Sequence, residues 1–233
     1  MSARVAIVLF PGTNCELDVA YAVERIGGSA TIVFHTERDL LGADAVIVPG
    51  GFAHGDYLRT GAIARFSPIM EAVAGFAREG GPVVGICNGF QVLCEARLLP
   101  GVLQKNAGLR FLCDTVEVEI VSARSALTSA ASAGDVLRLP INHFEGNYTC
   151  DAGTLERLRA DDRIVARYVD NPNGSLDDIA GISNEDGNVV GLMPHPERAI
   201  EAILGSDDGI VLLRSLLDAA AAHPTPALAR TTT

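Results

Sequence analysis

Two short runs of this chain are apolar at every position, and they limit the possible folds more than any other feature. The runs are Ala45-Val46-Ile47-Val48 and Val83-Val84-Gly85-Ile86. Strands that are apolar on both faces are typical of a parallel sheet covered by helices on each side. The other segments of a βαβα alternation are apolar runs at 4–9 and 30–34 and amphipathic stretches at 16–27, 60–79 and 88–97. We therefore expect an α/β protein with a mostly parallel central sheet flanked by helices.

The second half of the chain has a different pattern. It predicts further strands at 115–121, 136–141 and 164–169, and a hairpin of 179–183 with 188–192 around Glu185-Asp186-Gly187. These signals indicate an added antiparallel segment. A last helix is expected at about 207–221, and it closes a single domain of residues 1–221. Residues 222–233 are rich in Ala, Pro and Thr, which predicts a disordered tail.

Composition excludes several classes of function. A net charge of -11 and the absence of Lys and Arg clusters argue against nucleic acid or an anionic membrane as a partner. No apolar stretch approaches the roughly 20 residues of a membrane span, and a strand-like segment follows residue 4 directly, so we expect a cytoplasmic protein without a signal peptide. Five cysteines without a C-x-x-C pair predict free thiols, with neither a disulfide framework nor a metal site.

Cys87 is the candidate nucleophile. It follows the apolar run 83–86 and has Gly85 and Gly89 two positions away on either side. This is the cysteine form of a nucleophile elbow, in which glycines allow a strand and a helix to approach closely. The alternative is a small buried apolar residue before a helix. The two glycines favour the nucleophile, whose pKa the helix N-terminus would lower.

His195 and Glu197 form the candidate base and its orienting group. They lie two residues apart in Met193-Pro194-His195-Pro196-Glu197, where the prolines favour extended backbone and place both side chains on one side. A carboxylate there can hold the imidazole in one tautomer while His195 takes a proton from Cys87. A lone histidine would more often be structural, so Glu197 decides the interpretation.

Two sources of backbone donors are expected at the carboxyl ends of the parallel strands. One is the N–H of Asn88, immediately after Cys87, and the other is the loop that begins Pro49-Gly50-Gly51-Phe52, in which Gly51 can turn its N–H inward. Together they would form an oxyanion hole, although the loop could equally be an ordinary tight turn. Neither G-x-x-x-x-G-K-[ST] nor G-x-G-x-x-G occurs, so these nucleotide-binding motifs are absent. The polar segment 142–147 follows a strand and is either a pocket wall or a surface turn.

These motifs resemble the class I (triad) glutamine amidotransferases, whose shared signature is G-x-C-x-G-x-Q followed by a distant H-P-E. Here the signature reads Gly85-Ile86-Cys87-Asn88-Gly89-Phe90-Gln91 and His195-Pro196-Glu197. Longer strings are similar to the glutaminase subunits of phosphoribosylformylglycinamidine synthases. They are FPGTNCELD, PGGFAHGDYLRTGAIARFSPIM, CNGFQVLCEARLLPG and MPHPERA, within a similarity that spans about residues 4–219.

The resemblance implies a flavodoxin-like class I glutaminase fold and hydrolysis of glutamine through a thioester on Cys87, with His195 and Glu197 completing the triad. It places Gly51 and Asn88 in the oxyanion hole. The residues that it implies for glutamine binding are Phe52, Gln91, Asn142, His143 and Phe144. It implies no cofactor in this chain. ATP and magnesium are expected on a large synthetase subunit (PurL), with a small bridging subunit (PurS) as a further partner.

Two alternatives use the same residues differently. Another class I amidotransferase would keep the triad but serve a different acceptor; the strings GDYLR and PHPERA argue against it. A thiol sensor or chaperone on the same fold would use Cys87 without hydrolysis. That reading leaves Gln91 and Glu197 without a purpose.

Overall fold

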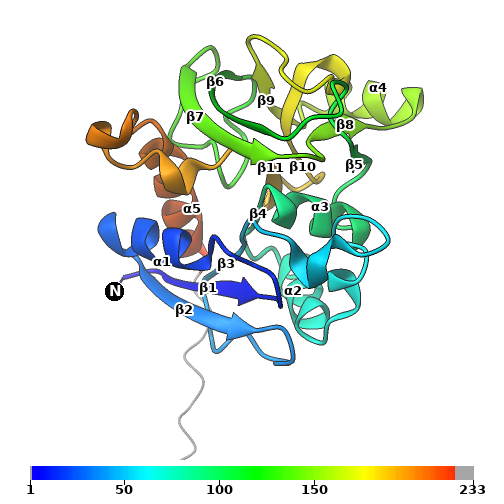
Figure 1. The fold of residues 1–233 in the computed structure, drawn as a ribbon. Helices are drawn as coiled ribbons and strands as arrows, with labels where there is room; N and C mark the ends of the chain where they lie inside the picture. Colours follow the sequence, from blue (N-terminus) through cyan, green and yellow to red (C-terminus); the bar gives the residue numbers. More distant parts are fainter. Residues whose placement is uncertain (1, 224–233) are drawn as a thin grey trace, which may run out of the picture.

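The computed structural model describes residues 2–223, and within them one twisted sheet of nine strands runs through the molecule (Figure 1). Its order is β2-β1-β3-β4-β11-β10-β9-β6-β7. The bounds are β1 Arg4–Leu9, β2 Ser29–Phe34, β3 Ala45–Val48, β4 Val83–Ile86, β6 Leu112–Ile120, β7 Val136–His143, β9 Ile164–Tyr168, β10 Ile179–Ser183 and β11 Val189–Leu192. A small antiparallel pair, β5 Val102–Gln104 and β8 Asn147–Thr149, lies beside it.

The sheet has a parallel half and an antiparallel half. Strands β2, β1, β3, β4 and β11 run parallel, whereas β11, β10, β9, β6 and β7 pair antiparallel. All residues of β3 and β4 are buried, as their apolar sequences predict. The expected α/β class, parallel run and added antiparallel segment are thus confirmed, and the antiparallel strands continue the same sheet.

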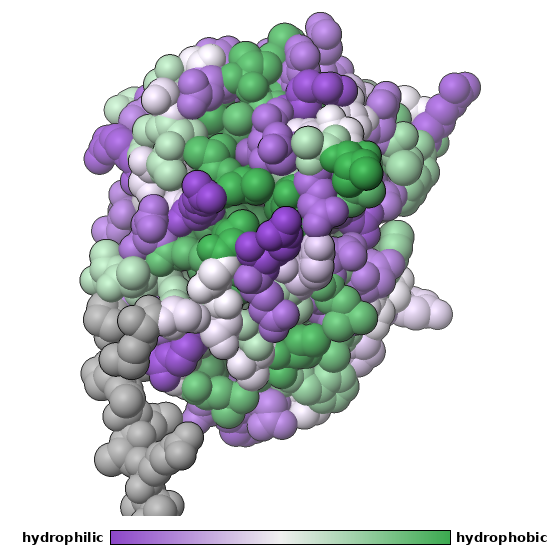
Figure 2. Space-filling model, turned by 90° about the vertical axis from the view of Figure 1, so that its left-hand side faces the viewer, coloured by the Kyte–Doolittle hydropathy of each residue, from purple (hydrophilic) through white to green (hydrophobic). Residues whose placement is uncertain are grey.

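Helices cover both faces of the parallel half. Helices α1 (Glu16–Arg25) and α5 (Gly209–Ala222) lie on one side, and α2 (Ile69–Arg78) and α3 (Asn88–Glu95) lie on the other (Figure 1). The face seen in Figure 2 carries interspersed apolar and polar side chains. None of the described helices has the length and apolar character needed to cross a membrane.

One predicted helix starts too early, and one helix of the structure was not predicted. The helix expected at 60–79 begins only at Ile69, because Gly61 has φ +75° and lies against the backbone of α3, and a short 3-10 helix at Ala64–Phe66 intervenes. Helix α4, Ala152–Ala160, was not predicted. Its sequence signal is Asp151, whose carboxylate accepts a hydrogen bond from the N–H of Thr154 at 2.9 Å as an N-cap.

The carboxyl-terminal prediction is partly outside the described residues. Helix α5 continues through Ala222, and the ring of His223 packs edge-on to Phe76 with ring centroids 6.0 Å apart. Ala222 and His223 are the first two residues of the predicted tail. Residues 224–233, on which the rest of the tail prediction falls, lie outside the described residues.

Candidate active site

Cys87 occupies the turn between β4 and α3 in a conformation that confirms the elbow. Its φ of +51° and ψ of -108° are unusual for a residue with a side chain. A β-carbon at Gly89 would lie 1.8 Å from the backbone oxygen of Val48, and one at Gly85 would lie 2.6 Å from the Gly89 backbone. The two glycines therefore permit a close approach of strand and helix that any larger residue would prevent.

Strand β11 brings the histidine segment to Cys87. It pairs parallel with β4, with Leu192 opposite Ile86, so the two strands end side by side. The N–H of Cys87 donates to the carbonyl of Leu192 at 2.8 Å. The chain then continues into His195 and the short 3-10 helix Pro196–Arg198. The extended backbone expected between His195 and Glu197 is therefore wrong, and a tight helical turn brings the two side chains together. Two segments more than 100 residues apart in sequence thus meet at one edge of the sheet.

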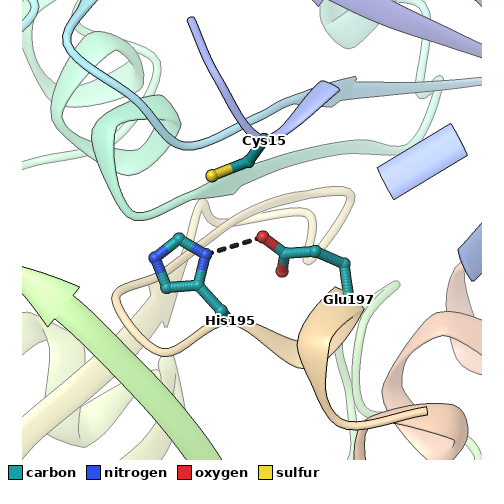
Figure 3. A group of neighbouring side chains, drawn as sticks. All are labelled: Cys15, His195 and Glu197. Atoms are coloured by element: carbon teal, nitrogen blue, oxygen red, sulfur yellow. Dashed lines mark hydrogen bonds and ion pairs between the residues drawn. The ribbon is translucent and has the colours of Figure 1, made fainter. Parts of the chain in front are cut away.

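His195 and Glu197 form a buried pair (Figure 3). Nδ1 of His195 lies 2.6 Å from Oε1 of Glu197, and their side chains are 2% and 0% exposed. Burial by itself lowers the pKa of His195, but the neighbouring Glu197 carboxylate and Cys87 raise it, and the net pKa lies well above its ordinary value. The pair is therefore built to hold a proton on the imidazole.

The nucleophile and the base converge on Gly50. A β-carbon there would lie 2.7 Å from Cε1 of His195 and 3.4 Å from Cβ of Cys87. The thiol of Cys87 donates to the carbonyl of Asn142 at 3.7 Å, and Nε2 of His195 has no hydrogen-bond partner among the described residues. Nε2 is thus free to accept a proton.

The loop after β3 is held against both the amino-terminal segment and Asn88. Gly51 has φ +147°, and the N–H of Phe52 donates to the carbonyl of Gly12 at 2.8 Å. The Asn88 side-chain oxygen accepts a hydrogen bond from the N–H of Ala53 at 2.9 Å. Asn88 is also the first residue of α3, where backbone N–H groups have no partner within a helix. These contacts place both predicted oxyanion-hole segments at one edge.

The five residues predicted to bind glutamine are placed as follows. Gln91 is buried, accepts a hydrogen bond from Asn88 Nδ2 at 2.8 Å and donates to the carbonyl of Glu145. His143 ends β7 and is buried, and its Nδ1 lies 3.1 Å from Oδ1 of Asn106. Asn142 and Phe144 flank His143 and are half-buried. Phe52 is 47% exposed. Their roles toward glutamine stay a prediction.

Four residues near the site were not singled out from sequence. Cys15 and Arg198 contact each other beside the His195–Glu197 pair, and Asp56 and Glu145 are joined to Asn88 and Gln91 by hydrogen bonds. Burial raises the pKa of Asp56 to about 6, although the hydrogen bond from Asn88 acts to lower it. The only sequence signal for Cys15, Asp56 and Arg198 is that they lie within the quoted motif strings. Glu145 lies in the polar segment that was considered a possible pocket wall.

One group among the described residues has ligand types that suit a metal ion. Cys15, His195 and Glu197 each offer an atom within 4.8 Å of the others, and all three are buried. The His195 and Glu197 atoms nearest to each other are already joined by the 2.6 Å hydrogen bond. His195 and Glu197 therefore already have each other as partners in this group.

The remaining cysteines and two of the histidines are not part of the group of Cys15, His195 and Glu197. Burial raises the pKa of the Cys94 thiol, which donates to the carbonyl of Pro100. Cys113 is exposed and Cys150 is half-buried. His35 and His54, expected in surface or loop positions, are half-buried and share the hydroxyl of Ser67 at 3.3 and 3.4 Å.

Comparison with protein families decides the assignment. The CobB/CobQ-like glutamine amidotransferase domain matches residues 2–207. This chain belongs to that glutamine amidotransferase family. Within the family, Cys87 and the His195–Glu197 pair are the natural candidates for the glutaminase chemistry, because they unite an elbow thiol with an oriented imidazole.

Individual amidotransferase relatives are similar over almost their full length. The phosphoribosylformylglycinamidine synthase subunit PurQ of Rubrobacter xylanophilus is 56% identical over 214 residues, which cover 92% of this chain and 97% of that protein. PurQ of Mycolicibacterium paratuberculosis is 53% identical over 219 residues, which cover 94% of this chain and 98% of that protein. A chain in the structure of PurLQS from Thermotoga maritima superposes with a TM-score of 0.86 at 39% identity, covering 94% of this chain and 99% of that one.

Proposed function

We propose that this chain is the glutaminase subunit of phosphoribosylformylglycinamidine synthase in de novo purine biosynthesis. It hydrolyses glutamine to glutamate and ammonia, and a synthetase subunit uses the ammonia in the ATP-dependent conversion of formylglycinamide ribonucleotide to formylglycinamidine ribonucleotide. The observation that carries this proposal is the Cys87 elbow beside the buried His195–Glu197 pair. The chain that holds it is more than half identical to proteins named phosphoribosylformylglycinamidine synthase subunit PurQ.

The first half-reaction forms a thioester. Sγ of Cys87 bonds to the side-chain amide carbon of glutamine while His195 accepts the thiol proton. When the tetrahedral intermediate collapses, the carbon–nitrogen bond breaks and His195 gives its proton to the departing nitrogen, which leaves as ammonia. The raised pKa of His195, due to Glu197 and Cys87 against the effect of burial, supports its role as the proton carrier.

The second half-reaction frees the thiol. His195 removes a proton from water while the water oxygen bonds to the thioester carbon. The carbon–sulfur bond then breaks, and His195 returns its proton to Sγ of Cys87, which leaves glutamate and the free thiol. The Glu197 carboxylate keeps Nδ1 of His195 hydrogen-bonded at 2.6 Å, so that Nε2 faces the reacting atoms.

Backbone donors stabilise the negative oxygen in both steps. We assign this role to the N–H groups of Gly51 and Asn88, each worth on the order of 3 kcal/mol in the transition state. Phe52, Gln91, Asn142, His143 and Phe144 are proposed to hold the glutamine. The hydrogen bonds of Gln91 to Asn88 and Glu145 support a positioning role for its amide within this pocket.

Ammonia must reach its acceptor before solvent protonates it, which requires a partner with a closed path. We propose the large synthetase subunit PurL as that partner and PurS as a small bridging subunit. Their support is the match to a chain of the Thermotoga maritima PurLQS structure. ATP and magnesium are assigned to the synthetase, and this chain of one proposed domain, residues 1–221, is assigned neither.

The five free cysteines support placing the reaction in the cytoplasm, a reducing compartment.

The proposal is tested by labelling with 6-diazo-5-oxo-norleucine, a glutamine-like electrophile. Intact-mass analysis and peptide mapping are applied to the full chain alone and with the synthetase subunits, with Cys87→Ser as the control. We expect a single adduct on Cys87 that glutamine prevents and that Cys87→Ser lacks.

Labelling that appears only with the subunits present indicates a glutaminase that its partner activates. Absence of an adduct on Cys87 in both conditions would overturn the proposal.

A further inference from the structure

A second buried thiol lies beside the catalytic pair. Figure 3 shows the sulfur of Cys15 facing the hydrogen bond between His195 and Glu197. Its sulfur, a ring nitrogen of His195 and a carboxylate oxygen of Glu197 lie within 4.8 Å of one another, and Cys15 is 3% exposed. The thiol therefore closes one side of the pair against water. The chemistry proposed above does not use it.

The backbone around Cys15 joins the two parts of the site. The N–H of Cys15 donates to the carbonyl of Gly50 at 3.2 Å, and Thr13 forms an isolated bridge with Gly51. Cys15 also directly precedes α1. Its position is consequently fixed by the oxyanion loop on one side and a helix on the other. A β-carbon at Gly50 would come within 3.2 Å of its sulfur, so the packing there is tight.

The sulfur has a charged partner. Nη2 of Arg198 donates to Sγ of Cys15 at 3.3 Å, and Nε of Arg198 donates to Oδ2 of Asp18 at 3.1 Å. The thiol itself lies 3.6 Å from Oδ1 of Asn14, to which it can donate. Arg198 directly follows Glu197. Burial lowers the pKa of Arg198, but Cys15, Glu197 and Asp18 outweigh it and raise the pKa above its ordinary value. Cys15 and Asp18 thus hold a cation next to the buried carboxylate.

We propose that Cys15 is a positioning residue of the glutaminase site, which fixes Arg198 and shields the His195–Glu197 hydrogen bond from water. It acts on Cys87 only through His195. The inference rests on the proposed glutaminase function. A buried carboxylate is stabilised by a nearby cation or donor, and the Glu197 carboxylate in turn orients His195 to accept the Cys87 proton.

The groups that act on this proton lie on several elements. Glu197 and Arg198 come from the short helix after β11, Cys15 and Asp18 from the start of α1, Cys87 from the elbow, and His143 from the end of β7. Burial first, and then His195, lowers the pKa of His143 to about 4, so His143 is neutral near pH 7. The charge balance around His195 therefore depends on Glu197, Arg198 and the thiol groups.

The test compares Cys15→Ala with Cys15→Ser, and Cys113→Ser serves as a control at an exposed thiol. Serine can still accept from Arg198 and donate to Asn14, whereas alanine can do neither. The rate of labelling of Cys87 by 6-diazo-5-oxo-norleucine is measured from pH 6 to 9.5 in the full chain with the synthetase subunits. Trypsin separates Cys15, on residues 5–25, from Cys87, on residues 79–97.

We expect Cys15→Ala to label about tenfold more slowly than wild type at pH 7, a fraction of the 10²–10⁴-fold that a positioned base contributes. The deficit should shrink toward pH 9.5, because hydroxide in the solvent increasingly removes the thiol proton without help from His195. In steady state, kcat should fall and KM should change little. Cys15→Ser should stay within about threefold of wild type at every pH.

A deficit of Cys15→Ala that is the same at all pH values, or no deficit, would overturn the inference. Thermal unfolding identifies a variant that fails to fold, and Arg198→Met then provides the second test with the same expected pH pattern. The proposed function fails separately, if wild-type Cys87 is not labelled at all. If Cys87 is labelled in the wild type and the Cys15 and Arg198 variants label at the same rate, only the positioning role is overturned and the proposed function stands.

Discussion

The side-chain oxygen of Asn88 accepts a hydrogen bond from the backbone N–H of Ala53 at 2.9 Å, and both residues are buried. Ala53 belongs to the loop after β3, whereas Asn88 directly follows the nucleophile. The Asn88 amide nitrogen also donates to Asp56 at 3.1 Å and to Gln91 at 2.8 Å. One side chain therefore locks the proposed oxyanion loop to the elbow.

Asn88→Ala should lower glutamine-dependent activity. The change leaves the Ala53 N–H buried without its acceptor and frees the loop that carries Gly51. Loss of one oxyanion donor costs about 10²–10³-fold, so a misplaced loop is expected to cost at least about tenfold in kcat. Steady-state assays of the reconstituted enzyme check this. Unchanged kcat with an unchanged Tm would contradict the role given to Asn88.

Glu197→Gln should reduce kcat by about 10²–10⁴-fold, because the amide can no longer stabilise the imidazolium or fix the productive tautomer. The side chain keeps its size, so the buried site should remain packed. Glu71→Gln is the matched control, since the Glu71 side chain is 85% exposed on α2. Equal activity of the two variants would show that Glu197 does not orient His195.

Alanine at two helical glycines should have opposite effects on stability. At Gly89 a β-carbon would lie 1.8 Å from the Val48 oxygen, and overpacking of this kind costs about 1–3 kcal/mol or more. At Gly75, within α2, it would meet nothing within 4 Å, and alanine should stabilise the helix by about 0.5–1 kcal/mol. Urea unfolding measures both. A stabilised Gly89→Ala would refute the close strand–helix approach.

His143 should make stability depend on pH. Burial first, and then His195, lowers its pKa to about 4, below the ~6.5 of an unfolded histidine. The unfolded chain therefore binds the extra proton between these values, so the contribution of His143 to the free energy of unfolding falls as the pH drops from 6.5 toward 4. The difference between wild type and His143→Gln, measured by urea unfolding, should shrink in that window. A pH-independent difference would contradict the neutral buried imidazole.

Asp56 should act in the opposite direction. Its folded pKa of about 6, raised mainly by burial, exceeds that of an unfolded aspartate, so the folded chain binds more protons between about pH 4 and 6. Its contribution to stability falls as the pH rises through this range. Asp56→Asn should therefore be stabilised relative to wild type more at pH 7 than at pH 4, as thermal unfolding at the two pH values would reveal. The reverse order would exclude the raised pKa.

Cys87→Ala should separate the two activities of the reconstituted complex. Glutamine-dependent synthesis requires the thiol, but the synthetase can accept free ammonia directly. We expect glutamine-dependent activity to be lost and ammonia-dependent activity to be retained. Loss of both would indicate that the substitution disrupts assembly, and retention of both would identify a different nucleophile.

Local sequence patterns predicted much of the fold. The hairpin of β10 and β11 was predicted because β-branched runs flank a turn at Glu185-Asp186-Gly187, and these are short-range signals. The start of α2 was predicted too early, because the residues after Thr60 have a sequence compatible with a helix. In the structure Gly61 packs against the backbone of Gln91 and Val92, which prevents a helix there. That constraint is a tertiary contact with α3, which no local pattern contains.

The sequence by itself determined which residues could carry the chemistry. The glycines around Cys87 and the prolines around His195 and Glu197 are local patterns, so these candidate residues are recognisable without a fold. Only the tertiary structure decided that β11 lies parallel to β4, which brings Leu192 opposite Ile86 and His195 to Cys87. It also decided that Cys15 and Arg198 meet at the same pair. Strand pairing and packing across distant segments depend on burial of the whole core, and residue spacing does not encode that directly.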